Sequence, residues 1–135
     1  MTAIDSVLPR LRTEEGFRAR AYRDTEGHLT IGYGLNIEAG ITPRSAAALL
    51  QSQLEELHET LSGYAWYAGL DPARQGVCLD IAFNDGLHGL LSFHNMIAAL
   101  GRQDWVTAQS ECHVQNPELK ERYDTLAKIL LTGEP

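Results

Sequence analysis

Glu15 and Asp24 are two acidic residues near the N-terminus whose side chains could together cleave a glycosidic bond. Such hydrolysis needs one carboxylic acid that protonates the leaving oxygen and one carboxylate that acts as nucleophile or activates water. The two residues are nine positions apart (24 − 15), which is up to about 30 Å in an extended chain, so a reversal at Gly16 must bring them together. The spacing permits the pair without establishing it. An Asp in such a turn usually serves to form the turn, and a Glu at the end of a helix is usually solvated.

The segments around this pair change from a helical pattern to a strand pattern. Residues 4–15 carry apolar side chains at helical spacing and are followed by Gly16, which predicts a short opening helix with a left-handed stop. Residues 17–34 carry apolar side chains at strand spacing on either side of the turn sequence Asp24-Thr25-Glu26-Gly27. We therefore expect a small β-hairpin or meander, with Asp24 in its turn.

Helical patterns dominate the rest of the chain. Thr42-Pro43 predicts the start of a helix whose apolar stripe continues to Ser62-Gly63. Asp71-Pro72 predicts the start of a largely apolar core helix that Gly86 closes. Further helix starts are predicted at Ser92, Asp104 and Asn116-Pro117. About six helices and one small β element indicate a mostly helical α+β fold.

Length and composition are those of a globular protein. With 135 residues, of which 44% are hydrophobic and 21% charged, the chain is the size of one domain with an adequate core. No stretch approaches the roughly 20 apolar residues of a membrane span, and the N-terminus lacks the apolar region of a secretory signal. We therefore expect neither membrane insertion nor a signal peptide. The net charge of −7 argues against nucleic acid or an anionic membrane as a partner.

The cysteines and histidines do not form a metal-binding pattern. Cys78 and Cys112 lie in segments with helical patterns, which favours buried free thiols, with a single disulfide as the alternative. Cys112 and His113 are adjacent, and neither Cys-x-x-Cys nor His-Glu-x-x-His spacing occurs. We expect no metal and no other cofactor.

The string from Leu11 to Gly34, LRTEEGFRARAYRDTEGHLTIGYG, closely resembles the signature of phage-type lysozymes and endolysins. In that family, the phage T4 lysozyme family or glycoside hydrolase family 24, a Glu is followed after eight residues by Asp and after five more by Thr. The signature closes with Thr-Ile-Gly-x-Gly. Glu15, Asp24 and Thr30 fit this spacing.

The resemblance implies a lysozyme-like α+β fold with a cleft between two lobes. The chain would form a single domain over residues 1–135. Within it we expect a small catalytic lobe at about 11–42, a linking helix at about 43–61 and a helical lobe at about 64–135.

A reaction is also implied by the resemblance. Glu15 would be the general acid, Asp24 the carboxylate that faces the anomeric carbon, and Thr30 the hydroxyl that helps to hold the attacking water in an inverting mechanism. The substrate would be bacterial peptidoglycan, cut at the β-1,4 bond between N-acetylmuramic acid and N-acetylglucosamine without a cofactor. We expect a monomer.

Weaker matches after residue 70 add candidate substrate contacts. Ala82-Phe-Asn-Asp-Gly86 resembles the family's core helix segment and would place Asn84 at the cleft. Ser92-Phe-His-Asn95 resembles the start of the next family helix and would place Asn95 near substrate. His28, in the hairpin, is a third candidate for a sugar contact. Ordinary helix-end and solvated side chains are the alternative interpretation of all three.

Arg122 is the candidate supporting residue. Counted back from Thr132-Gly133, which matches the family's closing Thr-Gly, it falls where these enzymes keep an Arg paired with the catalytic Glu. Such a cation would hold Glu15 in place and tune its proton affinity. A surface Arg on an amphipathic helix is the alternative.

Two departures from the family pattern concern the β lobe. Leu35 follows Gly34 where the family often has a His, so any ion pair made by that His is absent. The segment between Gly34 and Thr42 is also short, which suggests a trimmed β lobe, a more open cleft and fewer sugar subsites.

Two other functions share most of these features. A lytic transglycosylase also uses an acid but forms an anhydro-sugar, and the retained Asp24 and Thr30 argue against it. A non-catalytic lysozyme-fold module that binds glycan or a protein would rarely keep all three residues at their spacing. The resemblance implies a phage or prophage endolysin that accumulates in the host cytoplasm and reaches the cell wall through a holin, although a tail-associated or effector lysozyme would look much the same.

Overall fold

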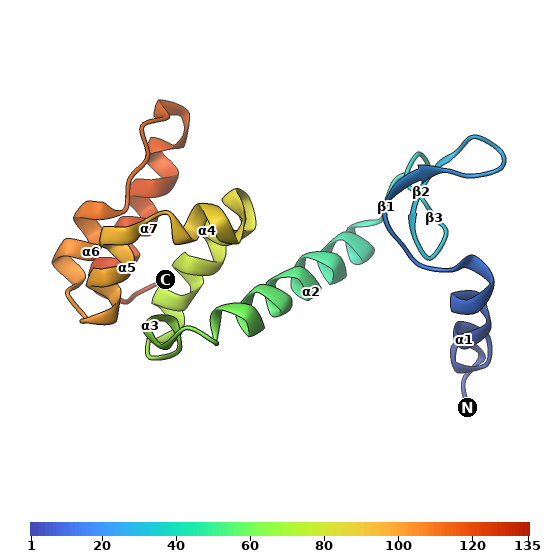
Figure 1. Cartoon of the computed structure of the whole chain (residues 1–135), viewed down its shortest axis with the longest axis horizontal. Coiled ribbons are helices and arrows are strands. Elements are labelled where there is room, and N and C mark those ends of the chain that lie inside the picture. Colours follow the sequence, from blue (N-terminus) through green and yellow to red (C-terminus); the bar gives the residue numbers. More distant parts are fainter. The chain divides into compact units, whose positions relative to one another are not determined.

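The computed structural model describes residues 1–135 and has the α+β composition that the sequence predicts (Figure 1). Seven α-helices and one short 3-10 helix accompany a single three-stranded antiparallel sheet. The chain divides into two compact units, Met1–Ala48 and Leu49–Pro135, each with its own secondary structure. None of the helices combines the length and the apolar character that a membrane crossing requires.

Helix α1 (Ala3–Glu15) opens the first unit. Thr2 caps it: the Thr2 hydroxyl accepts a hydrogen bond from the backbone N–H of Asp5, and the Asp5 carboxylate accepts one from the N–H of Thr2. The helix ends at Gly16, where φ is +67°, a conformation that glycine adopts without steric cost. The predicted opening helix and its stop are confirmed, and Glu15 is the last helical residue.

Three short strands follow α1: β1 (Arg18–Arg23), β2 (Leu29–Gly32) and β3 (Leu35–Asn36). β2 is the central strand and pairs antiparallel with both neighbours, so that Thr30 lies opposite Tyr22 of β1 and Asn36 of β3. The β1–β2 turn is closed by the N–H of Gly27, which donates to the carbonyl of Asp24. The sequence therefore predicted the meander correctly, with Asp24 in its first turn.

Helix α2 (Pro43–Leu61) begins where Thr42-Pro43 predicts. The Thr42 hydroxyl accepts a hydrogen bond from the N–H of Ser45, and proline is well tolerated in a first helical turn because that turn has no use for its N–H. The helix passes from the first unit into the second, and Leu61 at its end is fully buried.

The second unit contains the helices α3 (Ala65–Ala68), α4 (Pro72–Leu91), α5 (His94–Gly101), α6 (Trp105–Glu111) and α7 (Lys120–Thr132), with the 3-10 helix η1 (Pro117–Leu119) before α7. Helix α6 packs against both α5 and α7, and α4 packs against α7. The largest fully buried side chains of this core are Leu61, Tyr67, Ile81, Leu90, Met96, Leu100 and Leu130. Burying one such side chain contributes about 1.5–3 kcal/mol, so this cluster is the main source of stability for the unit.

The sequence misplaced two boundaries around α4. Gly86 does adopt a non-helical conformation (φ +78°), but the chain resumes the helix after it and continues to Leu91. Ser92 does not begin the next helix. Its hydroxyl donates to the carbonyl of Gly89 and terminates α4, while α5 begins at His94. A hydroxyl can serve either helix end, and the sequence pattern alone does not distinguish the two.

Arg74 joins the start of α4 to the end of α7, a contact that the sequence did not reveal. Its guanidinium donates to the backbone carbonyls of Leu130 (2.8 Å) and Leu131 (3.1 Å) and to the carboxylate of Asp71 (2.7 Å). It also stacks on the ring of Trp105, 3.8 Å from the ring centroid. Because carbonyls at a helix end lack partners within the helix, this buried cation supplies them.

Cys78 and Cys112 are both buried and both free thiols, as the helical patterns around them favoured. Burial raises the pKa of each thiol to about 12. Neither thiol is therefore a nucleophile at neutral pH.

Candidate active site

The Glu15 carboxylate lies against Gly34, at the turn between β2 and β3. A side chain at Gly34 would place its Cβ 2.5 Å from Oε2 of Glu15, closer than any real contact of this kind. Gly34 also has a positive φ of +76°, which permits the tight turn. The closing glycine of the motif thus makes room for the carboxylate and brings it to the end of the sheet.

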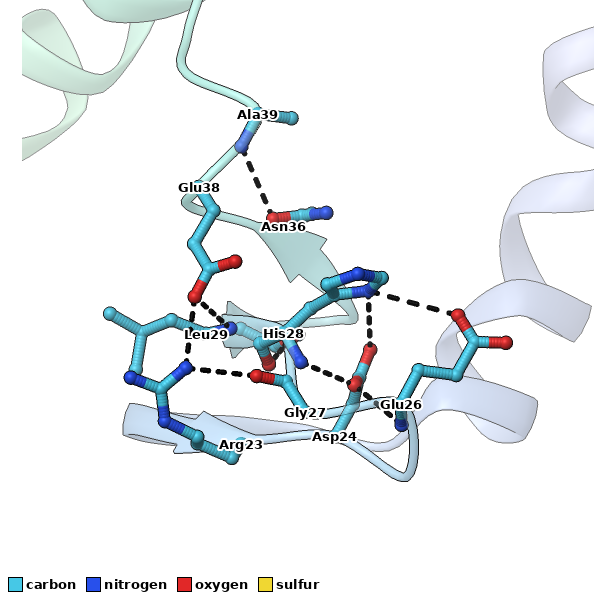
Figure 2. A network of polar contacts seen from close by, with 10 residues as sticks. Arg23, Asp24, Glu26, Gly27, His28, Leu29, Asn36, Glu38 and Ala39 are labelled. Carbon is cyan, nitrogen blue, oxygen red and sulfur yellow. Dashed lines mark hydrogen bonds and ion pairs between the residues drawn. The ribbon is translucent and has the colours of Figure 1, made fainter.

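The Asp24 carboxylate is fixed by the backbone of its own turn (Figure 2). Its Oδ1 accepts hydrogen bonds from the N–H of His28 (2.8 Å) and from the N–H of Glu26 (2.9 Å). The hydrogen bond from the N–H of His28 has the largest effect and lowers the pKa of the Asp24 carboxyl. Desolvation raises this pKa slightly, the bond from Glu26 lowers it further, and the net result is a pKa below the ordinary value. Asp24 is therefore an ionised carboxylate with one oxygen, Oδ2, that has no backbone donor.

Thr30 lies in the central strand and is almost fully buried, with 3% of its surface exposed. Its hydroxyl donates to the backbone carbonyl of His28 at 2.9 Å. This bond leaves the two lone pairs of the hydroxyl oxygen as acceptors. Thr30 also connects β2 to the turn that carries Asp24, because His28 is the residue that holds the Asp24 carboxylate.

His28 presents its side chain to the carboxylates of the turn. Its Nδ1 lies 3.7 Å from Oδ2 of Asp24 and 3.7 Å from Oε2 of Glu26 (Figure 2). Nearly half of the imidazole is exposed. The predicted sugar-contacting residue and the predicted catalytic carboxylate are therefore neighbours.

Arg23 and Glu38 brace the same turn, and the sequence analysis missed both. Nη1 of Arg23 donates to the carbonyl of Gly27 (2.8 Å) and to Oε1 of Glu38 (2.9 Å), and this Oε1 also accepts from the N–H of Leu29 (3.1 Å). The Leu29 bond, followed by the Arg23 contact, lowers the pKa of Glu38. The partners are 15 residues apart, so no local sequence pattern indicates the pair.

The short segment after β3 is closed by its own contacts. Asn36 accepts a hydrogen bond from the N–H of Ala39 at 3.2 Å, and the N–H of Gly40 donates to the carbonyl of Ile37. Leu35, which stands where the family often has a His, is half-exposed on β3. The Arg23–Glu38 ion pair ties this segment to the hairpin.

Asn84 and Arg122 meet in the second unit through Asp80, another residue that the sequence analysis missed. Nδ2 of Asn84 donates to the backbone carbonyl of Asp80 (2.9 Å). The guanidinium of Arg122 donates to Oδ1 of Asp80 through Nη2 (2.6 Å) and Nε (3.1 Å). All three residues line a surface groove of about 380 Å³ that also contains Leu50, Leu54, Leu79 and Phe83. The pairing of Arg122 with Glu15 remains a prediction.

Asn95 lies in the first turn of α5, away from that groove. It lines a separate hollow of about 430 Å³ together with His94, Glu111 and His113. The ring of Phe93, also at this hollow, stacks on Tyr123 with 6.1 Å between centroids. The structure thus brings Asn84 together with Arg122 but places Asn95 at a different depression of the second unit.

Residues 12–128 of the chain match the family described as phage lysozyme. The chain belongs to the phage lysozyme family. This membership confirms the resemblance carried by residues 11–34 and supports a lysozyme-type peptidoglycan hydrolase. In this member of the phage lysozyme family, Glu15 is the last residue of α1, Asp24 lies in the β1–β2 turn and Thr30 lies in β2.

Two curated proteins show what this chain is similar to. The pre-baseplate central spike protein Gp5 of Enterobacteria phage T4 is 26% identical, and the match covers 95% of this chain but 28% of that protein. A probable T4-type lysozyme 1 from Dictyostelium discoideum is 24% identical, and the match covers 96% of each chain. The chain therefore spans little more than a quarter of the first relative and nearly all of the second.

Proposed function

We propose that this phage lysozyme family member is an endolysin-type muramidase. It would hydrolyse the β-1,4 bond between N-acetylmuramic acid and N-acetylglucosamine in peptidoglycan by acid/base catalysis. The observation that carries the proposal is that one compact unit contains both carboxylates. The Asp24 carboxylate is ionised and held by backbone N–H groups, and the Glu15 carboxylate lies in the space left by Gly34. These are the two groups that glycoside hydrolysis requires.

In the proposed reaction, Glu15 protonates the leaving glycosidic oxygen. Asp24, which remains charged because the turn lowers its pKa, stabilises positive charge at the anomeric carbon and orients the attacking water. Thr30 helps to hold that water through its remaining lone pairs.

Inversion of the anomeric centre is proposed from the fit of Glu15, Asp24 and Thr30 to the phage lysozyme motif, and the two carboxylates belong to residues that flank β2. Asp24 lies in the turn before this four-residue strand, and Gly34, against which Glu15 rests, lies just after it. An inverting enzyme leaves room for a water molecule between its two carboxylates. Inverting enzymes need this space, whereas retaining enzymes hold their carboxylates closer.

Substrate contacts are proposed for Asn84, Asn95 and His28, and a supporting role is proposed for Arg122. Asn84 and Arg122 line one groove of the second unit, which supports placing sugar there. The net charge of −7 gives no long-range attraction to an anionic cell wall, so short-range contacts of this kind would have to supply the affinity.

The proposal is tested by clearing of a purified peptidoglycan suspension. We expect wild-type protein to clear it, and Glu15→Gln to be slower by at least about 100-fold because the acid is lost. Glu14→Gln is the matched control, since Glu14 is exposed and only approaches Arg10, at 3.8 Å. This control should stay within about twofold of wild type.

Mass spectrometry of the released fragments distinguishes the alternatives. Reducing, hydrated ends would support the muramidase, and NMR of the first product anomer would report inversion. Anhydro ends would identify a lytic transglycosylase instead. Folded wild-type protein that binds peptidoglycan without clearing it, across pH and salt, would leave the binding module as the better assignment.

The biological setting that we propose is release from the cytoplasm of a bacterial host late in phage infection, as a monomer acting on the cell wall through a holin. Membership of a phage lysozyme family is the support for this setting. Bacteria expressing the protein should lyse only after the inner membrane is permeabilised, for example with chloroform. Lysis without permeabilisation would exclude dependence on a holin.

A further inference from the structure

The imidazole of His28 faces the only Asp24 oxygen that the backbone leaves free. Oδ1 of Asp24 is occupied by two N–H groups, whereas Oδ2 lies 3.7 Å from Nδ1 of His28 (Figure 2). A charge-assisted hydrogen bond between such groups is about 2.8 Å long. The ring therefore stands roughly 1 Å short of a direct bond to this oxygen.

The charged groups around the imidazole are mainly acidic. Glu26 approaches Nδ1 at 3.7 Å from the turn, and Glu38, in the segment after β3, also interacts electrostatically with His28. The guanidinium of Arg23, a cation of the same network, is bound to Glu38 and to the carbonyl of Gly27. A proton on His28 would therefore be met by carboxylates, with Asp24 and Glu26 closest.

The side chain of His28 is not needed to shape the turn. The N–H of His28 holds Oδ1 of Asp24, and its carbonyl accepts from the N–H of Asp24 and from the hydroxyl of Thr30. These are backbone groups that any residue other than proline provides. The imidazole is thus available for a separate role at Oδ2.

We propose that His28 switches the Asp24 carboxylate off in acid by binding Oδ2 when the imidazole is protonated. This inference rests on the proposed function, in which Asp24 must offer that oxygen to water and to the reacting carbon. The only chemical change is transfer of a proton from solvent to the ring. Histidine gains this charge between pH 8 and 5, whereas Asp24 remains ionised throughout that range.

The test compares the pH dependence of turnover for wild type and His28→Gln on solubilised glycan strands. Wild-type kcat should fall as the pH is lowered from 8 to 5, and His28→Gln should reduce that fall by about fivefold or more. His88→Gln is the matched control, because His88 lies in α4 and should keep the wild-type profile. A His28 that only contacts sugar would change KM or the rate equally at every pH, and parallel profiles would overturn the inference.

A second measurement does not depend on activity. In this same chain, the NMR signals of the His28 ring at pH 5 should differ between wild type and Asp24→Asn, because the ring loses its contact with Oδ2 of Asp24. Identical ring signals in the two proteins would overturn the inference even if the enzyme is active. A wild-type protein without activity would instead overturn the proposed function. The contact between His28 and Asp24 could then no longer control catalysis.

Discussion

Asp24 and Glu15 are positioned by different means, and this difference is visible only at the scale of single residues. Asp24 is held by hydrogen bonds from main-chain N–H groups, whereas the Glu15 carboxylate is accommodated by the missing side chain of Gly34. A hydrogen-bonded group resists displacement, but a group that merely fits into a space can be pushed out of it. Glu15 is therefore the more easily misplaced of the two.

Gly34→Ala should damage activity more than stability. The new Cβ would meet Oε2 of Glu15 at 2.5 Å and displace the carboxylate, and a shift of about 1 Å in a reacting group can cost on the order of 100-fold in rate. Gly32→Ala is the matched control: its φ is also positive, at +66°, but nothing lies within 4 Å of its Cβ. Both variants should lose about 1–2 kcal/mol of unfolding free energy from backbone strain.

Clearing assays and urea denaturation on the two glycine variants decide the matter. Only Gly34→Ala should lose at least about tenfold in activity beyond its stability cost. Equal activity losses in both variants would show that backbone strain in the turn matters and that contact with Glu15 does not.

At the scale of elements, the Arg74 contact between α4 and α7 should be a large single contribution to the second unit. Arg74→Met keeps the aliphatic stem but leaves Asp71 and two helix-end carbonyls without their cation. Because the Asp71 side chain is 37% exposed, most of the loss should come from the two helix-end carbonyls left without a donor, which cost about 1–3 kcal/mol each. Arg102→Met is the control, because Arg102 is exposed and its ion pair with Asp104 (3.3 Å) is worth about 1 kcal/mol or less.

The same contact predicts an acid dependence of stability. Burial raises the pKa of the Asp71 carboxyl, but the hydrogen bonds and the charge of Arg74 together outweigh burial and lower this pKa below its ordinary value. A lowered folded-state pKa contributes stability that is present above the unfolded value, near 4, and is lost as the pH falls through the folded value. The difference between the urea midpoints of wild type and Arg74→Met should therefore narrow below about pH 4, where the Asp71 contribution is lost, and should not vanish, because the carbonyl contacts of Arg74 do not titrate. A difference that stays constant at all pH values would contradict the pair.

Most elements could be predicted from the sequence because their signals are local. The stop at Gly16, the turn at Asp24 and the helix starts at Thr42, Asp71 and Asp104 each depend on side chains within three or four residues. Helix α3 was missed because four residues are too few to show helical periodicity. Arg74, Asp80 and Glu38 were missed for the opposite reason, since their partners are distant in sequence.

The candidate site was predictable to a similar extent. Residue types and spacing identified Glu15, Asp24 and Thr30, and the turn sequence indicated how Asp24 could be held. The orientation of the His28 ring toward Oδ2 could not be predicted, because it depends on side-chain torsions that the sequence pattern does not specify. The roles of these residues remain predictions until the variants are assayed.

At the scale of the whole molecule, the buried core of the second unit has a simple chemical reporter. Cys78 and Cys112 are 0% and 3% exposed, and burial raises the pKa of both thiols to about 12. At pH 8 only about 1 in 10,000 of such thiols is ionised, so labelling by a thiol reagent should require unfolding. The expected result is no reaction of the native protein within minutes and two reactive thiols in urea.

Labelling rates across urea concentrations would then report the opening of this core. Arg74→Met should label faster than wild type by about tenfold for each 1.4 kcal/mol of stability that it loses, and Arg102→Met should label at nearly the wild-type rate. Rapid labelling of the native wild type would show that the core opens without global unfolding.

The comparison with relatives also bears on the whole molecule. The alignment with the phage T4 spike protein extends over 161 residues, whereas this chain has 135, so at least 26 positions of that relative (161 − 135) have no counterpart here. The predicted trimming after Gly34 is one place for such a difference. The structure shows how a short segment can still be anchored there, through Glu38 and Asn36.

The main-chain support of Asp24 has a consequence for how this enzyme can evolve. Because the amides of residues 26 and 28 supply the hydrogen bonds, the side chains at these two positions are free to change without dislodging the carboxylate. Lineages that meet hosts of different acidity could therefore exchange the residue beside the free oxygen while inheriting the same two carboxylates, Glu15 and Asp24. Under the proposed switch, position 28 is a site of adaptation, and its identity across environments would record the pH at which each family member has had to work.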